Sequence, residues 1–332
     1  MESVNDISIL IVTYKRPHFL DSLISQLVSQ TILPKFIIII DNDKDKSALP
    51  IFEKYKDSFN EIGFTYKVNY INSLTTGRNL GVDLVQTNLV FILDDDISIS
   101  NNYVGVMSQS LYSLPKAIGV QASLSFPTRS KTRNFYSRFF RHFHLTKRKS
   151  KVFSSINGSY PNGIEQRLPL ECEWFSGTNQ LYYTDILRLI RWDENLIAYG
   201  DGEDIDHSFR INKSGLGKIW LIPTEKITHY ATDVSRNIGY SAIFMREAYS
   251  YYLLYRLFGP KIQYKIIFIW SRLGFALLDL LKIAKTTSMK SNLNCNFEYF
   301  KALKETFLLR HDIRNGNLDE VNKRILQYSK VE

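Results

Sequence analysis

Cysteine is scarce in this chain: only Cys172 and Cys295 occur among its 332 residues. Two thiols cannot form the disulfide framework of a small secreted domain, nor a cysteine-rich zinc site. The first residues, Met1 to Asp6, also lack the charged and then apolar pattern of a secretory signal. Both absences predict a protein of the cytoplasm.

Long hydrophobic runs without charge are missing as well. The most apolar stretch, residues 262–284, contains Lys265, Arg272 and Asp279, so no uninterrupted segment reaches the length of a bilayer. We expect this stretch to form a buried or interfacial helix that does not cross a membrane. The sequence also has no internal repeats, no G-x-x-x-x-G-K-[S/T] loop and no G-x-G-x-x-G motif after its first apolar run.

What the chain does have is an uneven excess of positive charge. The 42 Lys and Arg residues exceed the 33 Asp and Glu residues by nine. Residues 129–151 hold nine basic residues and no acidic one, and residues 240–290 hold eight basic and two acidic ones, whereas 1–128 and 152–239 are both mildly acidic. A uniformly basic nucleic-acid binder does not have this distribution. With 44% hydrophobic residues, the chain can also bury a core.

The first 125 residues alternate short apolar runs with stretches that carry apolar residues at helical spacing. This rhythm predicts an α/β fold: a Rossmann-like, mostly parallel sheet flanked by helices, followed by an α-helical C-terminal extension. In such sheets ligands bind beyond the carboxyl ends of the strands. The expected strands are 7–12, 36–40, 64–68, 89–93 and 218–222, and the expected helices are 18–30, 47–59, 76–86 and one that ends at Lys213.

Three consecutive aspartates follow the expected strand 89–93. Strand alternation places Asp94 and Asp96 on one face, where two carboxylates can hold one divalent cation. The same sequence pattern also fits a solvated acidic turn, or a helix cap by Asp96 or Ser98. His229 lies after the expected strand 218–222 and can complete a manganese site, although an isolated histidine is more often structural.

A second acidic group, Gly202-Glu203-Asp204-Ile205-Asp206, precedes a predicted helix. A carboxylate there can take a proton from a hydroxyl that becomes a nucleophile. Acidic residues in a first helical turn also simply complement the helix dipole. Residues 75–79 leave a similar choice, because they can bring Arg78 and backbone N–H groups to phosphates or form a plain helix cap by Thr75 or Thr76.

Five segments, taken together and in order, resemble the family 2 glycosyltransferases of the GT-A fold. The likeness covers roughly residues 5–235, and each motif alone is weak. Lys15 stands where the family more often has Asn. Gly177 stands alone where the family often has two glycines. The segments are Ile9–Pro17, Ile39–Asn42, Gly77–Gly81, Phe91–Asp96 and Gly202–Asp206.

The resemblance implies a role for each matching residue. Asp204 would be the catalytic base, and Mn²⁺ or Mg²⁺ the cofactor. The nucleotide sugar would be bound by Thr13, Tyr14, Arg16, Asp41, Arg78, Asp94 and Asp95; Trp174, Gly177 and Glu203 would lie on the acceptor side; and Asp96, His229 and Asp94 would hold the metal.

The resemblance also implies a function. The chain would be an inverting, metal-dependent enzyme that moves one sugar from a nucleotide sugar, with UDP favoured and dTDP-rhamnose an alternative. The acceptor would be a hydroxyl of a glycan or lipid-linked glycan in bacterial surface polysaccharide synthesis, such as capsule or O-antigen. Processive synthases carry Gln-x-x-Arg-Trp after the acidic pair, whereas here Arg188–Trp192 precedes it. The alternative is a non-catalytic module on a decayed transferase scaffold that binds a membrane or nucleic acid.

The basic segments suggest how the protein is located. Phe135, Phe139 and Phe143 recur every four residues within 129–151, which predicts an amphipathic helix that contacts an anionic membrane or a lipid diphosphate. Aromatic core packing and nucleic-acid binding are the alternatives, the latter the least favoured. Residues 240–290 resemble an interfacial helix pair, or pack on the core. These features predict a peripheral position at the inner face of the plasma membrane and leave the oligomeric state open.

The expected domain organisation has two parts. Residues 1–239 would form the catalytic domain, and 240–332 a helical extension at the membrane interface. The basic, aromatic stretch 126–170 interrupts the α/β rhythm. A loop of this length inside a compact domain predicts a functional lid or a disordered segment.

Overall fold

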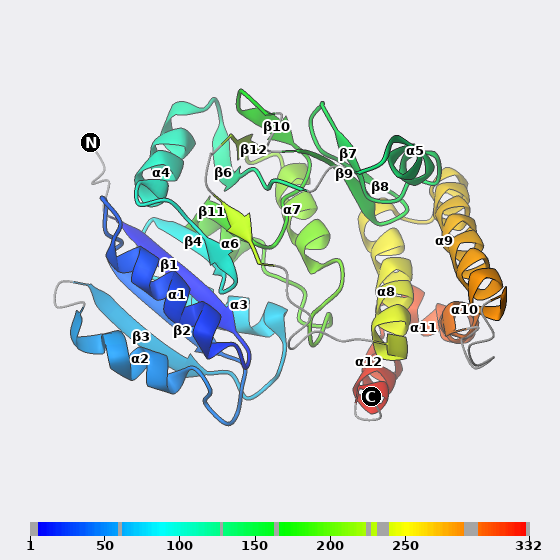
Figure 1. The fold of residues 1–332 in the computed structure, drawn as a ribbon, viewed down its shortest axis with the longest axis horizontal. Helices are drawn as coiled ribbons and strands as arrows, with labels where there is room; N and C mark the ends of the chain where they lie inside the picture. The colour runs from blue at the N-terminus through cyan, green and yellow to red at the C-terminus, as the bar shows by residue number, and fades with distance from the viewer. Residues whose placement is uncertain are drawn as a thin grey trace.

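The computed structural model describes residues 6–58, 62–126, 129–162, 166–223, 227–230, 239–288 and 298–329. Residues 1–5, in the segment that lacks the pattern of a secretory signal, and Cys295 lie outside these ranges. Figure 1 shows the sheet on one side of the molecule and the helices α8–α12 on the other.

An eight-stranded sheet forms the centre of the fold, in the order β10-β12-β6-β11-β4-β1-β2-β3. Six strands run in one direction, and β11 and β10 run against them. The mostly parallel α/β fold is therefore confirmed. The strands are β1 Ile7–Thr13, β2 Phe36–Asp41, β3 Gly63–Val68, β4 Leu89–Asp94, β6 Ala117–Ala122, β10 Leu170–Cys172, β11 Asn179–Tyr183 and β12 Lys218–Ile222.

Helices flank the sheet and bury one apolar face each. In α1, Leu20, Leu23, Ile24 and Leu27 are buried, the spacing expected of an amphipathic helix. The cap of α3 is Ser73, whose hydroxyl accepts a hydrogen bond from the Thr76 amide, so the expected cap by Thr75 or Thr76 is wrong. These helices are α1 Pro17–Val28, α2 Leu49–Tyr55 with the 3₁₀ turn η1 Lys56–Ser58, α3 Leu74–Leu84, α4 Tyr103–Ser113, α6 Thr184–Leu189 and α7 Glu203–Lys213.

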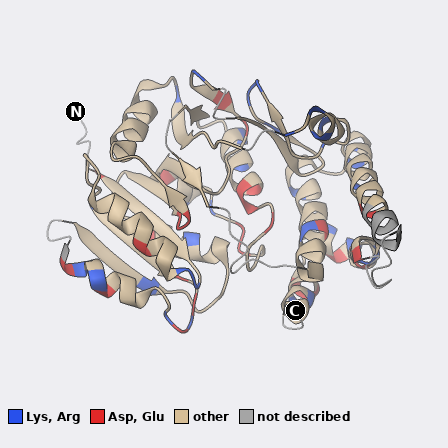
Figure 2. Cartoon of the chain, in the orientation of Figure 1, with Lys and Arg blue, Asp and Glu red and all other residues tan. Residues whose placement is uncertain are grey.

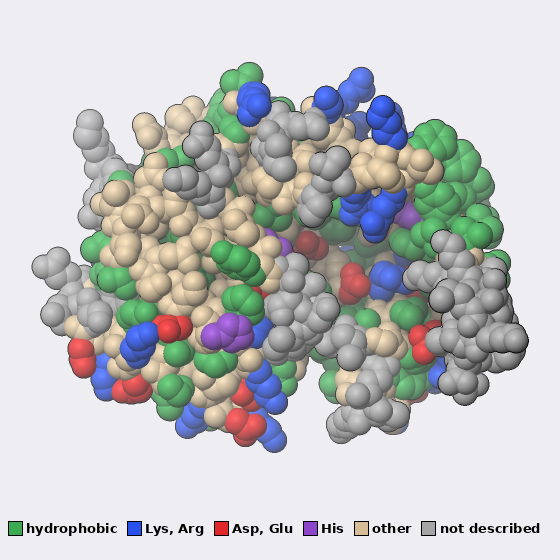
Figure 3. Space-filling view, in the orientation of Figure 1, with side chains coloured by type: hydrophobic (Ala, Val, Ile, Leu, Met, Phe, Trp, Pro, Cys, Tyr) green, Lys and Arg blue, Asp and Glu red, His purple; other side chains and the backbone are tan. Residues whose placement is uncertain are grey.

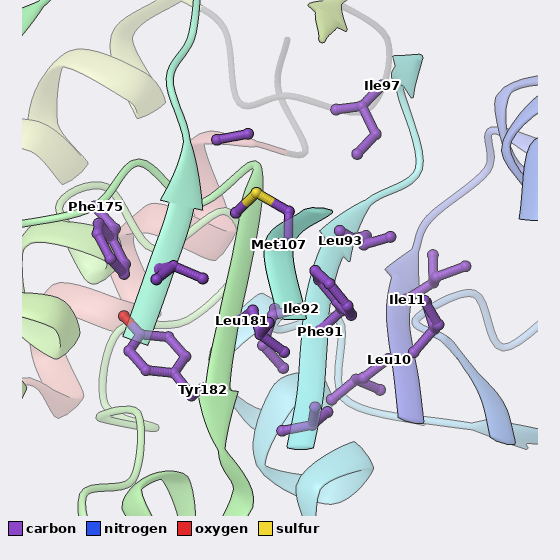
Figure 4. Close-up of a cluster of buried hydrophobic side chains, with 14 of the residues drawn as sticks. Leu10, Ile11, Phe91, Ile92, Leu93, Ile97, Met107, Phe175, Leu181 and Tyr182 are labelled. Atoms are coloured by element: carbon purple, nitrogen blue, oxygen red, sulfur yellow. The ribbon is translucent and has the colours of Figure 1, made fainter. Parts of the chain in front are cut away.

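The main core lies between the sheet and its helices. Strand β1 is buried along its whole length, as expected for a parallel strand covered on both faces. Figure 4 shows Phe91, Ile92 and Leu93 of β4 beside Leu181 and Tyr182 of β11. This packing holds the carboxyl ends of β1 and β4 in register, with Thr13 of β1 opposite Asp41 of β2 and Val12 opposite Asp94.

The stretch expected to be a lid or disordered is folded where the structure describes it. Helix α5, Lys131–Phe139, is followed by a three-stranded sheet of β7 His144–Thr146, β8 Lys151–Phe153 and β9 Asn157–Pro161. The expected longer helix is also wrong: α5 ends at Phe139, and the Phe143 ring instead contacts Phe126 and Trp174. Aromatic burial from neighbouring segments decided this arrangement, which the four-residue spacing within the segment does not reveal.

The C-terminal helices form a second hydrophobic cluster around α8. Charged and polar contacts join it to α7 and to the loop after α6: Arg256 binds Asp206 at 2.9 Å and Asp193 at 3.4 Å, and the Tyr252 hydroxyl donates to Asp193 at 2.6 Å. Whether this cluster is a separate domain beginning at residue 240 stays a prediction. The elements are α8 Gly239–Leu253, the π-helical turn η2 Leu254–Phe258, α9 Ile262–Ser288, α10 Glu298–Leu308, α11 Arg310–Arg314 and α12 Asp319–Tyr328.

Among the described residues, no helix is long and apolar enough to cross a membrane. Helix α9 exceeds the expected 262–284 at its end, but its charged positions interrupt the apolar run.

Candidate active site

A cavity of about 250 Å³ opens at the carboxyl ends of β1 and β4, where an α/β sheet places ligands. Most of the residues expected to bind a nucleotide sugar, a metal or an acceptor meet there. Those that line it are Thr13, Tyr14, Arg16, Arg78, Asp94, Asp96, Gly177, Glu203, Asp204 and His229.

Asp94, Asp96 and His229 form a group that can hold a metal ion. Their ligand atoms all lie within 4.8 Å of one another. Two carboxylates and an imidazole suit Mn²⁺, and the carboxylates alone suit Mg²⁺. The chemistry of these side chains thus fits the expected divalent cation. Burial raises the pKa of Asp94, against the attraction of Arg78.

A two-stranded sheet brings His229 to the aspartates. Strand β13, Thr228–His229, pairs with β5, Ile97–Ser98, so that His229 lies opposite Ile97. The Tyr230 amide also donates to the Asp96 carbonyl at 2.9 Å. These backbone contacts hold His229 Nε2 at 3.3 Å from Asp96 Oδ1, although 133 residues separate the two in the chain.

Arg16 ties the first loop of the cavity to the acidic triplet. Its guanidinium binds Asp95 at 2.8 Å and Asp96 at 2.9 Å. Asp95 is fully buried and also accepts a hydrogen bond from the Thr13 hydroxyl at 2.5 Å. The carboxylate of Asp95 therefore holds the loop after β1 in place through Arg16 and Thr13. Asp95 itself is not among the residues that line the cavity.

Arg78 is buried, with 1% of its surface exposed, and it links the two acidic groups. It binds Glu203 at 2.6 Å and Asp94 at 3.3 Å, and it donates to the Gly177 carbonyl at 3.1 Å. A Cβ atom at Gly177 would lie about 3.1 Å from the Arg78 guanidinium and 3.2 Å from Glu203. A side chain at Gly177 would thus crowd the ion pair, which favours glycine at this position.

Asp204 lies in the first turn of α7, on the side of the cavity formed by the loop that ends at Gly202. Gly202 has φ +87°, a left-handed conformation that favours glycine. Burial raises the pKa of Asp204 to about 6, opposed by the hydrogen bond from the Ile205 amide and by Arg78. A carboxylate with such a pKa is ionised at neutral pH and basic enough to accept a proton.

Besides Asp95, two residues expected at the site lie elsewhere. Asp41 is fully buried, and its carboxylate accepts hydrogen bonds from the amides of Asp43 and Ala48 and from the Tyr66 hydroxyl. Trp174 is 5% exposed and donates to the Ser159 carbonyl within the core. Neither side chain lines the cavity, because hydrogen bonds to neighbouring residues hold each of them in the protein interior, away from the cavity.

Sequence reasoning missed other lining residues. Asn42 follows Asp41 directly, inside a segment already noted, and it could have been found from that position. Tyr199 and Asp201 belong to the loop that precedes α7, and no pattern marked them. The further lining residues are Val12, Asn42, Asn72, Leu74, Ser176, Thr178, Ala198, Tyr199, Gly200, Asp201 and Gly202.

Comparisons with known proteins agree with this arrangement. Residues 8–167 match the sequence profile of "Glycosyl transferase family 2". A cholesterol galactosyltransferase of Borreliella burgdorferi is 30% identical over 111 residues, which are 33% of this chain and 29% of that relative. The chain thus spans less than a third of that protein's length.

Solved structures show the same fold at low sequence identity. TarS of S. aureus, with UDP-GlcNAc bound, has a TM-score of 0.54 and 14% identity over 98% of this chain and 92% of its own. A mannosyltransferase of Pyrobaculum calidifontis has a TM-score of 0.53 and 11% identity over 98% of this chain and 86% of its own. The profile match, the sheet and the cavity together lead to one conclusion: residues 8–167 have the sequence pattern of glycosyltransferase family 2, and the chain has the GT-A fold.

Proposed function

We propose that this protein is an inverting, metal-dependent glycosyltransferase that moves one sugar from a nucleotide sugar to a hydroxyl of an acceptor glycan. One observation carries the proposal: the group of Asp94, Asp96 and His229, which can hold a metal ion, lines the same cavity as Asp204, a carboxylate whose pKa burial raises. A cation site and a base in one cavity are what glycosyl transfer from a diphosphate requires.

The donor would lie between the first loop and the acidic triplet. Asp94, Asp96 and His229 would hold Mn²⁺ or Mg²⁺, which when bound supplies positive charge for the diphosphate leaving group. Thr13, Tyr14 and Arg16 would contact the nucleotide. Because Glu203, Asp94 and the Gly177 carbonyl occupy the Arg78 guanidinium, we assign Arg78 a positioning role in place of a diphosphate contact.

Asp204 would act on the acceptor. As the acceptor oxygen forms its bond to the anomeric carbon, the bond from that carbon to the phosphate oxygen breaks, and Asp204 takes the hydroxyl proton. One displacement inverts the anomeric carbon and needs no covalent intermediate. Glu203 would hold the acceptor side of the cavity through its ion pair with Arg78.

UDP is our preferred donor nucleotide, and an acceptor in bacterial surface polysaccharide synthesis, such as capsule or O-antigen, is our preferred setting. Two similar folds were solved with UDP-GlcNAc or with UDP, GalNAc and Mn²⁺, and a third with GDP-Man and Mn²⁺. These ligands support a nucleotide sugar and a divalent cation without selecting the sugar. We further propose a lipid-linked or free glycan acceptor and a position at the inner face of the plasma membrane.

Nucleotide sugars are expected to stabilise the protein against heat in the presence of Mn²⁺. A ligand that binds only the folded state at 100 times its Kd adds about 2.7 kcal/mol to the free energy of unfolding. The measurement is a thermal-shift screen of UDP, UDP-GlcNAc, UDP-galactose, GDP-mannose and dTDP-rhamnose, with Mn²⁺ and with EDTA. If none of them shifts the Tm and the chain binds RNA tightly, the non-catalytic alternative is favoured.

The rate of transfer is expected to depend on pH through Asp204. Its pKa in the folded protein is about 6, above the ordinary carboxyl value of 3.8. Only the ionised carboxylate accepts a proton, so kcat should be level above pH 7 and should fall about tenfold per pH unit well below pH 6. The measurement is kcat against pH at saturating donor and Mn²⁺. A level profile down to pH 4.5 would contradict Asp204 as the base.

A further inference from the structure

The outer surface of α5 and α9 is strongly apolar. On α5, Phe135 is 70% exposed and Phe139 is 53% exposed, with their rings stacked 6.2 Å apart. On α9, residues at intervals of three and four share one exposed face. We name this surface the apolar face: Phe135, Phe139, Ile266, Ile269, Leu273 and Leu277. Figure 3 shows hydrophobic side chains gathered over these two helices.

Contacts on the inner side hold the two helices together. The Tyr136 hydroxyl donates to the Gly274 carbonyl at 2.6 Å, and the Trp270 indole donates to the Phe139 carbonyl at 2.9 Å. The Phe140 ring packs so closely on α9 that a side chain at Gly274 would overlap it. Because these contacts fix α5 against α9, the side chains of the apolar face stay on the outer surface of the two helices.

Cations border the apolar face directly. Lys131, Arg133 and Arg138 are exposed on α5 itself, and Figure 2 shows basic residues on this helix. Next to it lies a cavity of about 540 Å³ whose lining includes seven Lys and Arg side chains and no carboxylate. Burial and then Arg138 and Arg141 lower the pKa of His144 at this cavity, in agreement with cations gathered around one space.

We propose that the apolar face and its bordering cations dock on the surface of an anionic lipid bilayer. Exposed apolar patches of this kind mark contacts with proteins or membranes. A second copy of this chain is disfavoured, because a two-fold interface would bring the same cations of both copies together. An apolar helix face with aromatic and basic neighbours lies in the headgroup region without crossing the bilayer.

This docking deepens the proposed function. Only its biological purpose rests on that function: a lipid-linked acceptor would reach the cavity from the same membrane. Basic residues would be attracted to anionic headgroups, and Phe135 and Phe139 would enter the interface between headgroups and acyl chains. Docking itself needs neither a donor nor a metal, so it can be measured apart from transfer.

The test is co-sedimentation of the full chain with vesicles of phosphatidylcholine, with and without phosphatidylglycerol. The unmodified protein should bind the anionic vesicles and lose binding in high salt. Phe135→Ser with Phe139→Ser should weaken partitioning by about tenfold for each ring, and Arg133→Gln with Arg138→Gln by roughly fivefold for each charge. The matched controls, Tyr112→Ser on α4 and Lys44→Gln with Lys67→Gln, should bind as the unmodified protein does.

Two results would overturn the proposal. One is an unmodified protein that stays in solution with anionic vesicles at low salt. The other is a dimer that dissociates in the Phe135→Ser, Phe139→Ser variant while the vesicle binding of that variant is unchanged. Thermal shifts by the nucleotide sugars, run on the same variants, report folding and donor binding, so failure of docking and failure of the proposed function give different results.

Discussion

Replacing Asp204 by asparagine is expected to lower kcat by about 10²- to 10⁴-fold, the usual contribution of a general base. The amide has nearly the same shape as the carboxylate and can still accept the hydrogen bond from the Ile205 amide at 2.8 Å. It cannot take a proton from the acceptor. Because the residues proposed to hold the metal lie on other elements, β4, the β4–β5 turn and β13, the affinity for the donor should change little. The kcat is measured as the rate of UDP release at saturating donor, and the affinity for the donor nucleotide is measured as the thermal shift by UDP.

The same substitution should make the folded protein more stable at neutral pH. Burial raises the pKa of Asp204 to about 6 from an ordinary value of 3.8, so the folded state holds the charged form at a cost. That cost is present in full above pH 6 and disappears below about pH 4. Removing the charge should therefore raise the free energy of unfolding by about 1–3 kcal/mol at pH 7.5. Asp185→Asn, at a side chain with 91% exposure, is the matched control.

A higher Tm together with lost turnover would identify Asp204 as a group whose buried charge serves catalysis at the expense of stability. Unchanged turnover in Asp204→Asn would mean that another group takes the proton. Glu203 would then be the next candidate to examine, since burial raises its pKa to about 7 despite the ion pair with Arg78.

Replacing Asp96 by asparagine is expected to weaken Mn²⁺-dependent donor binding by about 100-fold or more. Loss of a residue that only supports a metal ligand commonly costs 10- to 100-fold in affinity, and Asp96 would be a ligand itself. Its carboxylate lies 3.3 Å from His229 and 2.9 Å from Arg16. The amide keeps the size of the side chain but loses the charge that the cation needs. The measurement is titration calorimetry of UDP-GlcNAc with and without Mn²⁺.

The control for Asp96 is its neighbour on the chain. Asp95 is not among the lining residues, and it binds Arg16 and Thr13, so Asp95→Asn should change the Mn²⁺ dependence of donor binding much less than Asp96→Asn does. If Asp96→Asn binds the donor equally well with Mn²⁺ and with EDTA, and as tightly as the unmodified protein does, the metal assignment is wrong.

Much of the sheet could be predicted from local patterns. The apolar runs at 7–12, 36–40 and 89–93 became β1, β2 and β4 with shifts of one residue, because a buried parallel strand must be apolar along its whole length. Polar residues directly after those runs were expected at one edge of the sheet, and Thr13 and Asp94 do line one cavity there. Parallel strands end at the same edge of a sheet, so the shared direction of these strands is enough to predict that the residues after them lie close together.

The stretch 126–170 could not be predicted in the same way. Its aromatic spacing resembles one long helix, but Phe143 finds its ring partners in Phe126 and Trp174, and only Lys131–Phe139 is helical. The choice between helix and sheet depended on burial against distant segments, which outweighs local spacing.

The sequence by itself determined the family resemblance, the α/β class and the acidic character of the site, because these depend on residue types and on periodicity along the chain. Only the tertiary structure decided which side chains face the cavity. Pairing of β5 with β13 brought His229 to Asp96. Hydrogen bonds in the protein interior hold the side chains of Asp41 and Asp95 away from the cavity. The orientation of a side chain follows from the partners that long-range packing supplies, and those partners lie far away in the sequence.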